Sequence, residues 1–581
     1  MTRIAVVDNT KLRDMDEKKH IQSLCPVNRS GTECIYFEDT KLMIDEKICI
    51  GCGICSNTAP ESIHIINLPE ELEQEPIHRY GKNLFELFSL PTPIFGKVVG
   101  VLGRNGIGKS TAIKVLAGML KPNLGGEKEA SYDDLIEYFK GTEAQNFFEK
   151  IKKGEIKVGY KPQQVDLITK AKSGTVRKLL ESVDEKKELD KISEELGLSN
   201  ILDNDIKKIS GGELQRVAIA ATVLKKANLY IFDEPTSYLD IKQRIKVSRF
   251  IKDLADEDTA ILVIEHDLII LDYMTDLVHI MYGKEDCYGI VAQPRSTRTA
   301  INTYLSGFLK EENIRFRNNQ IKFETRPTNK KNTSNLLTSW KNIEKKLGKF
   351  DLKATEGEVY KKDVIGILGE NGIGKTSFVK ILAGADKADK GEIETEVKVS
   401  YKAQYLDSES DEIVAVLLAD ILKKYEAQVI NPLNIKPLLT KKLNELSGGE
   451  LQRVSIALCL GQDADLYLLD EPSAYLDVEQ RLIISKVIRD LMDVKGKTAL
   501  IVDHDLLFLD YLSKRLLIFD GEPAIKGDAK GPFDMEDGMN MFLEDIAMTF
   551  RRDPETNRPR ANKQDSVKDR EQKSQNKYYY F

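Results

Sequence analysis

The chain has 581 residues, several times the length that one hydrophobic core usually supports, so we expect two to four domains. Its 41% hydrophobic and 31% charged residues exclude a disordered chain and a membrane protein. The formal net charge of −7 is too small to indicate nucleic-acid binding by the whole chain. The lack of a long apolar run and of a signal-peptide core predicts a cytoplasmic protein with no membrane partner.

The N-terminal stretch carries five of the seven cysteines, all before residue 56, which favours one local site over a disulfide framework. A C-x2-C-x2-C run and a cysteine-proline pair are typical of bacterial-type ferredoxins. Residues 1–67 are therefore predicted to form a small ferredoxin-like α+β iron-sulfur module. The predicted metal ligands are Cys25, Cys49, Cys52 and Cys55. The other cysteines, expected to be ordinary small apolar residues, are Cys34, Cys287 and Cys459.

The rest of the chain repeats itself. The sequence SGGELQRV begins at Ser210 and again at Ser447, and each copy follows a glycine-rich loop and precedes an acidic pair. Signature serine and acidic aspartate are 23 residues apart in both copies. We therefore expect one duplicated domain. The predicted boundaries are 68–293 and 331–531 for the two copies, 294–330 for a connector and 532–581 for a basic C-terminal tail.

The first copy is longer than the second. From the lysine of the glycine-rich loop to the signature serine there are 101 residues in the first copy and 72 in the second. The additional residues are placed near 125–152, where two amphipathic helices are expected around a Gly-Thr turn.

Each glycine-rich loop follows an apolar strand and precedes a helical run, the context that a phosphate-binding loop requires. Glycines let backbone N–H groups surround phosphates, Lys109 and Lys375 supply a cation, and the hydroxyls of Ser110 and Thr376 can hold Mg²⁺. The candidate ATP-binding residues are Gly103, Asn105, Gly106, Gly108, Lys109, Ser110 and Thr111, with Gly369, Asn371, Gly372, Gly374, Lys375, Thr376 and Ser377 in the second copy.

Each acidic pair follows an apolar run that reads as a buried parallel strand, so its carboxylates should lie at the strand's C-terminal end, beside the phosphate loop. Asp233 and Asp470 would order the Mg²⁺ shell. Glu234 and Glu471 would act as catalytic residues that polarise an attacking water.

These motifs together resemble those of ATP-binding-cassette ATPases from about residue 70 to 530. The resemblance implies an α/β fold with two tandem cassettes facing head to tail, so that one site pairs Lys109 with Ser447 and the other Lys375 with Ser210. It also implies the Q-loop Mg²⁺ ligands Gln163 and Gln404, D-loop residues Asp240 and Asp477, and catalytic switch histidines His266 and His504. The signature residues that would bind ATP are Ser210, Gly211, Gly212, Glu213, Ser447, Gly448, Gly449 and Glu450.

The cysteine module, the insertion and the closing FRRDP and RPR segments narrow the resemblance to the ABC-E subfamily, the ribosome-recycling ATPases. This implies a monomer that uses ATP-driven closure to split ribosomes after termination or rescue and then stays on the small subunit. The implied partners are the ribosome, its small subunit and rRNA, and a peptide-release or rescue factor. The implied cofactors are ATP, Mg²⁺ and iron-sulfur clusters.

The cysteine set departs from the family, which typically has two four-iron clusters. The four ligand positions without cysteine are Leu12, Glu17, Ile21 and Ala59. Because the fourth cysteine of each run ligates the other cluster, these four positions are all the ligands of one cluster. We therefore expect one [4Fe-4S] cluster, with the second absent. A zinc site and a metal-free remnant remain open.

Two other functions stay open: a ribosome-assembly or initiation factor whose ATPase acts as a timer, and an ABC-F-like translation factor, which would have no cysteine module. Arginines of the connector and tail would bridge the cassettes or contact rRNA phosphates. They are Arg295, Arg298, Arg315, Arg317, Arg551, Arg552, Arg558 and Arg560.

Overall fold

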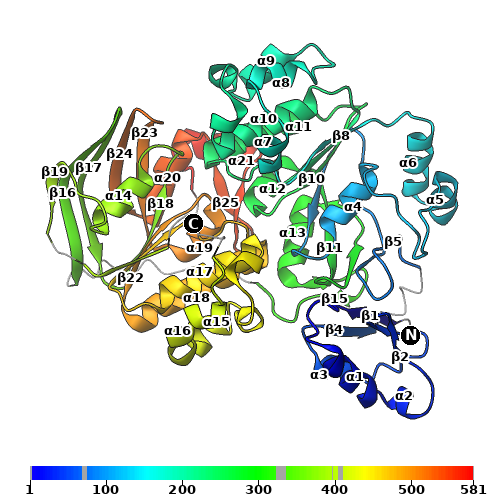
Figure 1. Ribbon diagram of the computed structural model, residues 1–581. Helices are drawn as coiled ribbons and strands as arrows, with labels where there is room; N and C mark the ends of the chain where they lie inside the picture. The colour runs from blue at the N-terminus through cyan, green and yellow to red at the C-terminus, as the bar shows by residue number, and fades with distance from the viewer. Residues whose placement is uncertain are drawn as a thin grey trace.

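The computed structural model describes residues 3–67, 75–321, 323, 335–394, 397–402 and 410–579. A small N-terminal module lies against the first of two larger α/β cassettes, and the C-terminal segment lies between the cassettes (Figure 1). The predicted α/β class with two tandem cassettes is confirmed. In the part of the chain that the structure describes, no helix is both long and apolar enough to span a membrane.

The N-terminal module contains two antiparallel strand pairs and three helices. Strand β1 pairs with β4, and β2 with β3. Its elements are β1 (Arg3–Val7), α1 (Met15–Leu24), α2 (Pro26–Arg29), β2 (Ile35–Glu38), β3 (Lys41–Ile44), α3 (Ile54–Thr58) and β4 (Ile63–Asn67).

The first cassette is built on a sheet in the order β5-β6-β12-β11-β7-β10-β9-β8. Its elements are β5 (His78–Arg79), β6 (Glu86–Leu87), β7 (Val98–Leu102), α4 (Lys109–Leu116), α5 (Tyr132–Tyr138), α6 (Glu143–Lys152), β8 (Val158–Lys161), α7 (Asp166–Ala171), α8 (Val176–Glu181), α9 (Leu189–Glu195), α10 (Gly211–Val223), β9 (Leu229–Asp233), α11 (Ile241–Asp253), β10 (Ala260–Ile264), α12 (Leu268–Met274), β11 (Leu277–Lys284) and β12 (Tyr288–Val291). The stretch 125–152 contains α5 and α6, which pack on each other through stacked Phe139 and Phe148 rings.

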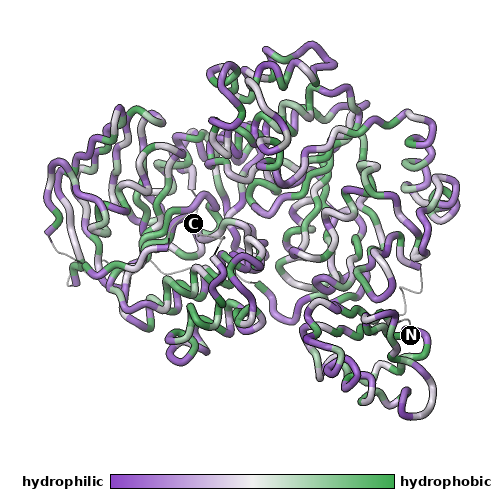
Figure 2. Tube along the Cα trace, viewed as in Figure 1, coloured by the Kyte–Doolittle hydropathy of each residue, from purple (hydrophilic) through white to green (hydrophobic). Residues whose placement is uncertain are grey.

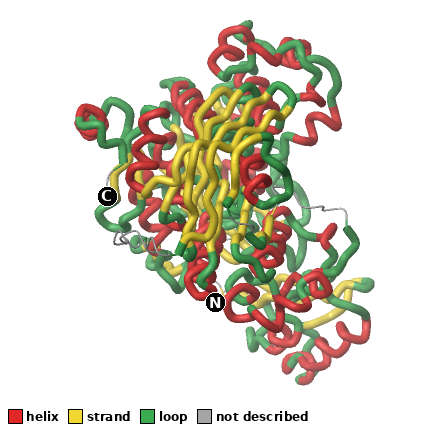
Figure 3. Tube along the Cα trace, turned by 90° about the vertical axis from the view of Figure 1, so that its left-hand side faces the viewer, coloured by secondary structure: helices red, strands yellow, loops and turns green. Residues whose placement is uncertain are grey.

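The second cassette repeats the parallel core in the order β23-β18-β22-β21-β20. Its elements are β16 (Leu336–Leu347), β17 (Phe350–Tyr360), β18 (Val364–Leu368), α14 (Lys375–Leu382), β19 (Lys390–Ile393), β20 (Val399–Lys402), α15 (Val414–Leu417), α16 (Ala419–Lys424), α17 (Gly448–Gly461), β21 (Leu466–Asp470), α18 (Val478–Lys495), β22 (Thr498–Val502), α19 (Leu506–Leu512), β23 (Arg515–Glu522) and β24 (Lys526–Asp534). Figure 3 shows the strands of this sheet with helices on both sides.

The connector and the tail add short elements at the junction of the cassettes. They are β13 (Arg295–Ser296), α13 (Thr297–Ser306), β14 (Phe308–Leu309) and β15 (Ile314–Arg315), followed after the second cassette by α20 (Met535–Asp545), β25 (Phe550–Arg552), β26 (Pro559–Ala561) and α21 (Val567–Ser574). Strand β13 pairs with β11 and thereby extends the first sheet.

The central strands of both sheets are formed by unbroken apolar runs of sequence. Every residue of β7, β9 and β10, and of β18, β21 and β22, is buried, as expected for parallel strands covered by helices on both faces. Figure 2 shows hydrophobic residues concentrated along these strands and hydrophilic residues along the outer loops. Because both sheets are buried in this way, the motifs at their strand ends lie on rigid supports.

The arginines of the connector and tail mostly contact carboxylates within the chain. Arg558 and Arg560 of the tail both pair with Asp272 of α12, at 3.2 and 2.7 Å, and Arg298 of the connector pairs with Asp553 at 3.0 Å. Arg295, Arg317 and Arg552 pair with Glu312, Glu479 and Asp510. Ion pairing within the chain is therefore favoured over rRNA contact for these six side chains, and four of them (Arg317, Arg552, Arg558 and Arg560) join the connector or the tail to a cassette. Arg315 is exposed.

Replacing Asp272 by Asn should destabilise the junction, because the Arg558 side chain is 0% exposed and would lose its counter-charge. Breaking such a buried pair typically costs about 3–5 kcal/mol. We expect a clearly lower midpoint in thermal unfolding and faster proteolysis of the tail. Glu555→Gln is the control, since Glu555 pairs with Arg298 at the surface. Equal effects of both variants would contradict this account.

Candidate functional site

The first phosphate loop joins β7 to α4. Gly108 caps the helix at φ 88°, and a Cβ atom there would lie 2.5 Å from the ring of Phe85, so only glycine fits. Lys109 is buried, and its Nζ donates to the carbonyl oxygens of Gly103 at 2.8 Å and Arg104 at 2.6 Å. The loop therefore holds the ammonium group at the start of the helix, where phosphates bind.

The second phosphate loop has the same construction. Gly374 caps α14 at φ 89°, and a Cβ atom there would lie 2.9 Å from the ring of Phe350. Lys375 Nζ donates to the carbonyl oxygens of Gly369 and Glu370, both at 2.7 Å. The repeat thus extends from the sequence to the side-chain geometry.

The acidic pair of the first cassette follows the buried strand β9. Asp233 is the last residue of this strand, and Glu234 turns away from it at φ 47°. Glu234 Oε1 accepts a hydrogen bond from Gln163 Nε2 at 2.6 Å and lies 3.6 Å from His266 Nε2. The structure thus brings the predicted glutamate, Q-loop glutamine and histidine together.

The second acidic pair is arranged similarly. Glu471 turns at φ 46°, and its Oε1 lies 3.7 Å from His504 Nε2. Thr376 Oγ1 donates to Asp470 Oδ2 at 2.8 Å, which brings both predicted Mg²⁺-shell groups into contact. Gln404 lies outside the described residues.

Burial controls the charges in both sites. Burial and the neighbouring Glu234 charge raise the pKa of Asp233 to about 6, and burial also raises the pKa of Glu234. Burial lowers the pKa of His266 and His504 well below the usual value, so both imidazoles are neutral at pH 7. A neutral imidazole can donate one hydrogen bond and accept another.

Each signature begins a helix with a capping box. Ser210 Oγ accepts from the backbone N–H of Glu213, whose carboxylate accepts from the backbone N–H of Ser210 at 2.7 Å. Ser447 and Glu450 repeat this arrangement at the start of α17. The remaining N–H groups of these helix ends, contributed by the signature glycines, are suited to bind an anion.

Contacts between the cassettes join each phosphate loop to the opposite D-loop. Asp477 Oδ2 accepts from the backbone N–H of Asn105 at 3.1 Å, and Asp240 Oδ2 accepts from that of Asn371, also at 3.1 Å. Both aspartates also cap the helices that follow them. The two contacts are equivalent under exchange of the cassettes, as the head-to-tail arrangement requires.

The second signature helix lies near the first phosphate loop. Asp286 donates its backbone N–H to Gly106 O at 3.0 Å. Burial raises the pKa of Asp286, and the charge of Glu450 in the opposite signature contributes to this increase. The pairing of Lys109 with Ser447 is consistent with this proximity.

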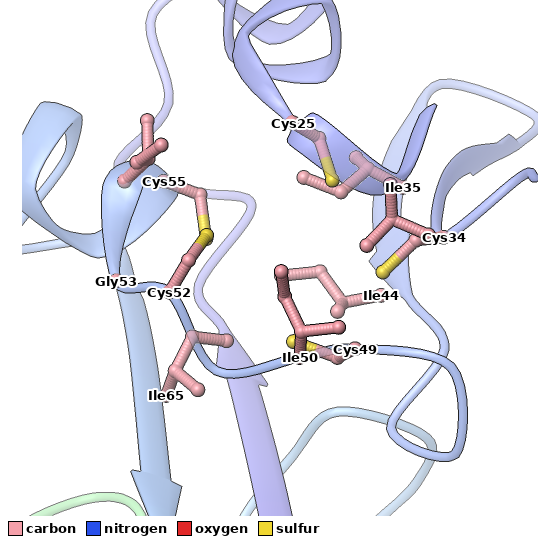
Figure 4. Close-up of a pocket in the computed structure, with 12 residues that line it drawn as sticks. Cys25, Cys34, Ile35, Ile44, Cys49, Ile50, Cys52, Gly53, Cys55 and Ile65 are labelled. Atoms are coloured by element: carbon pink, nitrogen blue, oxygen red, sulfur yellow. The ribbon is translucent and has the colours of Figure 1, made fainter. Parts of the chain in front are cut away.

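Five cysteines line one pocket of the N-terminal module (Figure 4). Four are the predicted ligands, and the fifth is Cys34, which we expected to be an ordinary small apolar residue and which lies beside them. Burial raises the pKa of the Cys34 thiol, with further contributions from Cys49 and Cys25, so these three side chains are neighbours. Within the described ranges, no three Cys, His, Asp or Glu side chains have an arrangement that could hold a metal ion.

The positions of the missing cysteines are mostly apolar and buried. Leu12, Ile21 and Ala59 belong to the hydrophobic core of the module, together with Cys25 and Cys55. Glu17 instead accepts a hydrogen bond from the backbone of Arg13 at the surface.

Two aromatic residues near the phosphate loops were missed. Phe85 and Phe350 precede the loop lysines by 24 and 25 residues, and each ring lies against the last loop glycine. An alignment of the two repeats would have placed these two residues at nearly equivalent positions. A single aromatic residue, taken by itself, is more often part of a hydrophobic core.

The chain has full-length relatives. A family model described as ABC transporter matches residues 94–237 and 352–474. An uncharacterised ABC transporter ATP-binding protein of Methanocaldococcus jannaschii is 50% identical over 100% of this chain and 97% of its own length. ABC transporter E family member 1 of Arabidopsis thaliana is 43% identical over 100% of this chain and 99% of its length. The chain belongs to the ABC-E family.

Two further comparisons agree with this assignment. The Saccharomyces cerevisiae protein named translation initiation factor RLI1 is 42% identical over 100% of this chain and 98% of its length. A solved structure titled as a model of ribosome-bound archaeal Pelota and ABCE1 superposes with a TM-score of 0.93 at 49% identity, covering 100% of this chain and 99% of that one. This ABC-E chain is an ABC-type ATPase that binds ATP and Mg²⁺, and the ABC-F alternative is excluded.

The contacts between D-loop and phosphate loop give a test of closure. Asp240→Asn and Asp477→Asn should keep the helix caps, since Asn caps as well as Asp, but weaken the charge-assisted bond across the interface. We expect each variant to lower the closed-to-open ratio roughly fivefold, about 1 kcal/mol, in fluorescence energy transfer between dyes on the cassettes with ATP. As a control, energy transfer between dyes on Glu127 and Lys153, both in the first cassette, should be the same in the variants and in the unchanged chain. Unchanged closure in both variants would contradict the assigned role of these contacts.

Proposed function

We propose that this chain splits ribosomes into subunits after termination or rescue, using ATP-driven closure of its cassettes, and then stays on the small subunit. The observation that carries the proposal is the pair of reciprocal contacts between each phosphate loop and the opposite D-loop. An ATP site shared by two cassettes can do work on a large particle, because ATP binding and hydrolysis then change the position of one cassette relative to the other.

In this proposal, the γ-phosphate drives closure. In the first site, its negative charge interacts with Lys109 of one cassette and with the signature N–H groups at Ser447 of the other. In the second site, Lys375 and the signature at Ser210 have the same roles. In each site, the lysine of one cassette and the signature N–H groups of the other reach the phosphate together only in the closed form. ATP therefore stabilises the closed form, and hydrolysis allows the cassettes to open.

The remaining site residues receive the roles that their positions allow. Glu234 and Glu471 polarise the attacking water, and the neutral His266 and His504 lie next to them to hydrogen-bond the transferred phosphoryl group. The Mg²⁺ ligands would be Ser110, Thr376, Gln163 and Gln404, and Asp233 and Asp470 would order the shell around the ion. Phe85 and Phe350 would contact the adenine ring.

Closure can reach the N-terminal module through the segment 78–87. Asn83, 1% exposed, donates Nδ2 to the carbonyl oxygens of Ala5 and Ile44 and accepts from the backbone N–H of Ile44. Near it in the same segment, the Tyr80 hydroxyl bonds Thr111 beside the first phosphate loop. We propose that this segment transmits the state of the first site to the module, which then moves against the ribosome.

The proposed partners follow from the family. The solved ABC-E structure is titled as ribosome-bound with Pelota, and we propose a ribosome, its small subunit and rRNA, and a Pelota-like release or rescue factor as partners of this chain. This role places the chain in the cytoplasm. The name of the yeast relative favours translation initiation as a second candidate function.

We further propose that Cys25, Cys49, Cys52 and Cys55 hold one [4Fe-4S] cluster. Their side chains line one pocket whose other walls include Ile44 and Ile65. No three of them are placed to hold a single metal ion as the side chains stand, but an all-thiol set in apolar surroundings has the donor chemistry of an iron-sulfur site. The cluster would stabilise the fold of the module. The apolar core at Leu12, Ile21 and Ala59 supports the absence of a second cluster.

Replacing both proposed catalytic glutamates tests the main proposal. Glu234→Gln with Glu471→Gln should slow hydrolysis strongly while leaving closure intact, because the amide cannot accept the proton of the attacking water. We expect the variant to split one round of ribosomes and remain on the small subunit in sucrose-gradient sedimentation with ATP.

Two results of this experiment are decisive. Binding to free small subunits without splitting of whole ribosomes would favour the initiation function. Failure to accumulate on any ribosomal particle would contradict a ribosomal role. The Lys109→Ala and Lys375→Ala double variant is the control that should neither close nor split.

Metal analysis tests the cluster. We expect four iron and four acid-labile sulfide per chain after anaerobic purification, as one [4Fe-4S] cluster requires. Cys25→Ala should lose both, whereas Cys34→Ala is the matched control that should keep them, since Cys34 is buried in the same pocket but is not a proposed ligand. Zinc without sulfide, or eight iron, would overturn the proposal.

A further inference from the structure

Two buried lysines lie next to the backbone of the acidic pairs. Lys161 ends β8 and Lys402 ends β20, at equivalent positions of the two sheets, and they are 0% and 2% exposed. Neither belongs to a phosphate loop or a signature. Burial of a lysine is costly unless its charge is compensated, so its presence in both repeats needs a reason.

Their ammonium groups bind the main chain at the ends of the acidic strands. Lys161 Nζ donates to the carbonyl oxygens of Asp233 at 2.9 Å and Glu234 at 3.1 Å. Lys402 Nζ donates to the carbonyl oxygen of Asp470 at 2.8 Å. The same chemistry therefore occurs independently in both cassettes.

The main chain held in this way is the turn that carries the proposed catalytic glutamates. Glu234 and Glu471 have φ values of 47° and 46°, a left-handed conformation that non-glycine residues rarely adopt. The Gln215 amide adds a hydrogen bond to Glu234 O at 2.7 Å, and Gln452 does the same for Glu471. Such a conformation persists only where surrounding groups fix it.

Each lysine is also surrounded by negative charges. Lys161 lies near the carboxylates of Asp233, Glu234 and Glu265. Lys402 lies near those of Asp470, Glu471 and Asp503. Each ammonium is thus the buried cation beneath a group of carboxylates, and it reduces their mutual repulsion.

We infer that Lys161 and Lys402 are positioning residues for ATP hydrolysis: each fixes the turn that aims the glutamate carboxylate at the attacking water. The inference rests on the proposed role of Glu234 and Glu471. The lysines do not bind nucleotide in this account, because their donors are directed to the strand-end carbonyl oxygens, and Lys109 and Lys375 serve the phosphates.

The test is the Lys161→Met, Lys402→Met double variant of the full chain, in which an unbranched side chain of similar size is kept and the ammonium group is removed. We expect kcat for ATP to fall by about 10- to 100-fold, because small misplacements of catalytic groups have effects of this size. The KM for ATP and the affinity for a fluorescent ATP analogue should change less than about threefold.

Lys18→Met is the matched control. Lys18 is also a buried lysine, 9% exposed, whose Nζ donates to the carbonyl oxygen of Thr40 at 2.8 Å, but it lies in the N-terminal module. Its kcat and KM should match those of the unchanged chain. A second variant with Gln at both positions retains one N–H donor group per site and should have an intermediate kcat. This variant keeps the test valid if the Met variant does not fold.

A combination with Glu234→Gln and Glu471→Gln separates the inference from the proposed function. If the lysines act through the glutamates, the quadruple variant should hydrolyse ATP no more slowly than the glutamate double variant. An additional loss in the quadruple variant, a parallel loss of nucleotide affinity, or unchanged kcat in the lysine variants would overturn the inference. Normal hydrolysis by the glutamate double variant would instead contradict the proposed catalytic role of the glutamates.

Discussion

The proposed function depends on the hydrogen bonds that Asp477 and Asp240 accept across the interface from the phosphate loops of the opposite cassettes. Each aspartate begins a helix of its own cassette while touching the nucleotide site of the other. A change at one phosphate loop therefore reaches the opposite sheet through a helix N-terminus rather than through a flexible loop. In the proposed mechanism, a change of nucleotide in either cassette therefore affects this interface.

The rest of the chain keeps the two cassettes in register for this contact. The tail pairs Arg560 with Asp272 of the first cassette and Arg552 with Asp510 of the second, so it links the two cassettes. Asn83 joins the N-terminal module to the segment next to the first phosphate loop. The two cassettes thus differ in their surroundings, because the cysteine module lies against the first of them (Figure 1).

The repeated motifs allowed the α/β fold and the family to be predicted from sequence. Identical residues at fixed spacing, such as the signatures at Ser210 and Ser447, can be matched without a structure because they are contiguous. Contacts between distant segments could not be predicted this way. Cys34 appears isolated along the chain and reaches the cysteine pocket only through the β2–β3 hairpin, and the partner of Arg558 lies 286 residues away.

The most direct test of the account is a high-resolution structure of the chain with Mg²⁺ and a non-hydrolysable ATP analogue in both sites. We expect the γ-phosphate bound by Lys109 to lie within hydrogen-bond distance of the signature at Ser447, and the one bound by Lys375 to lie equally close to Ser210. If each γ-phosphate instead had all its ligands from a single cassette, the proposed mechanism would be contradicted.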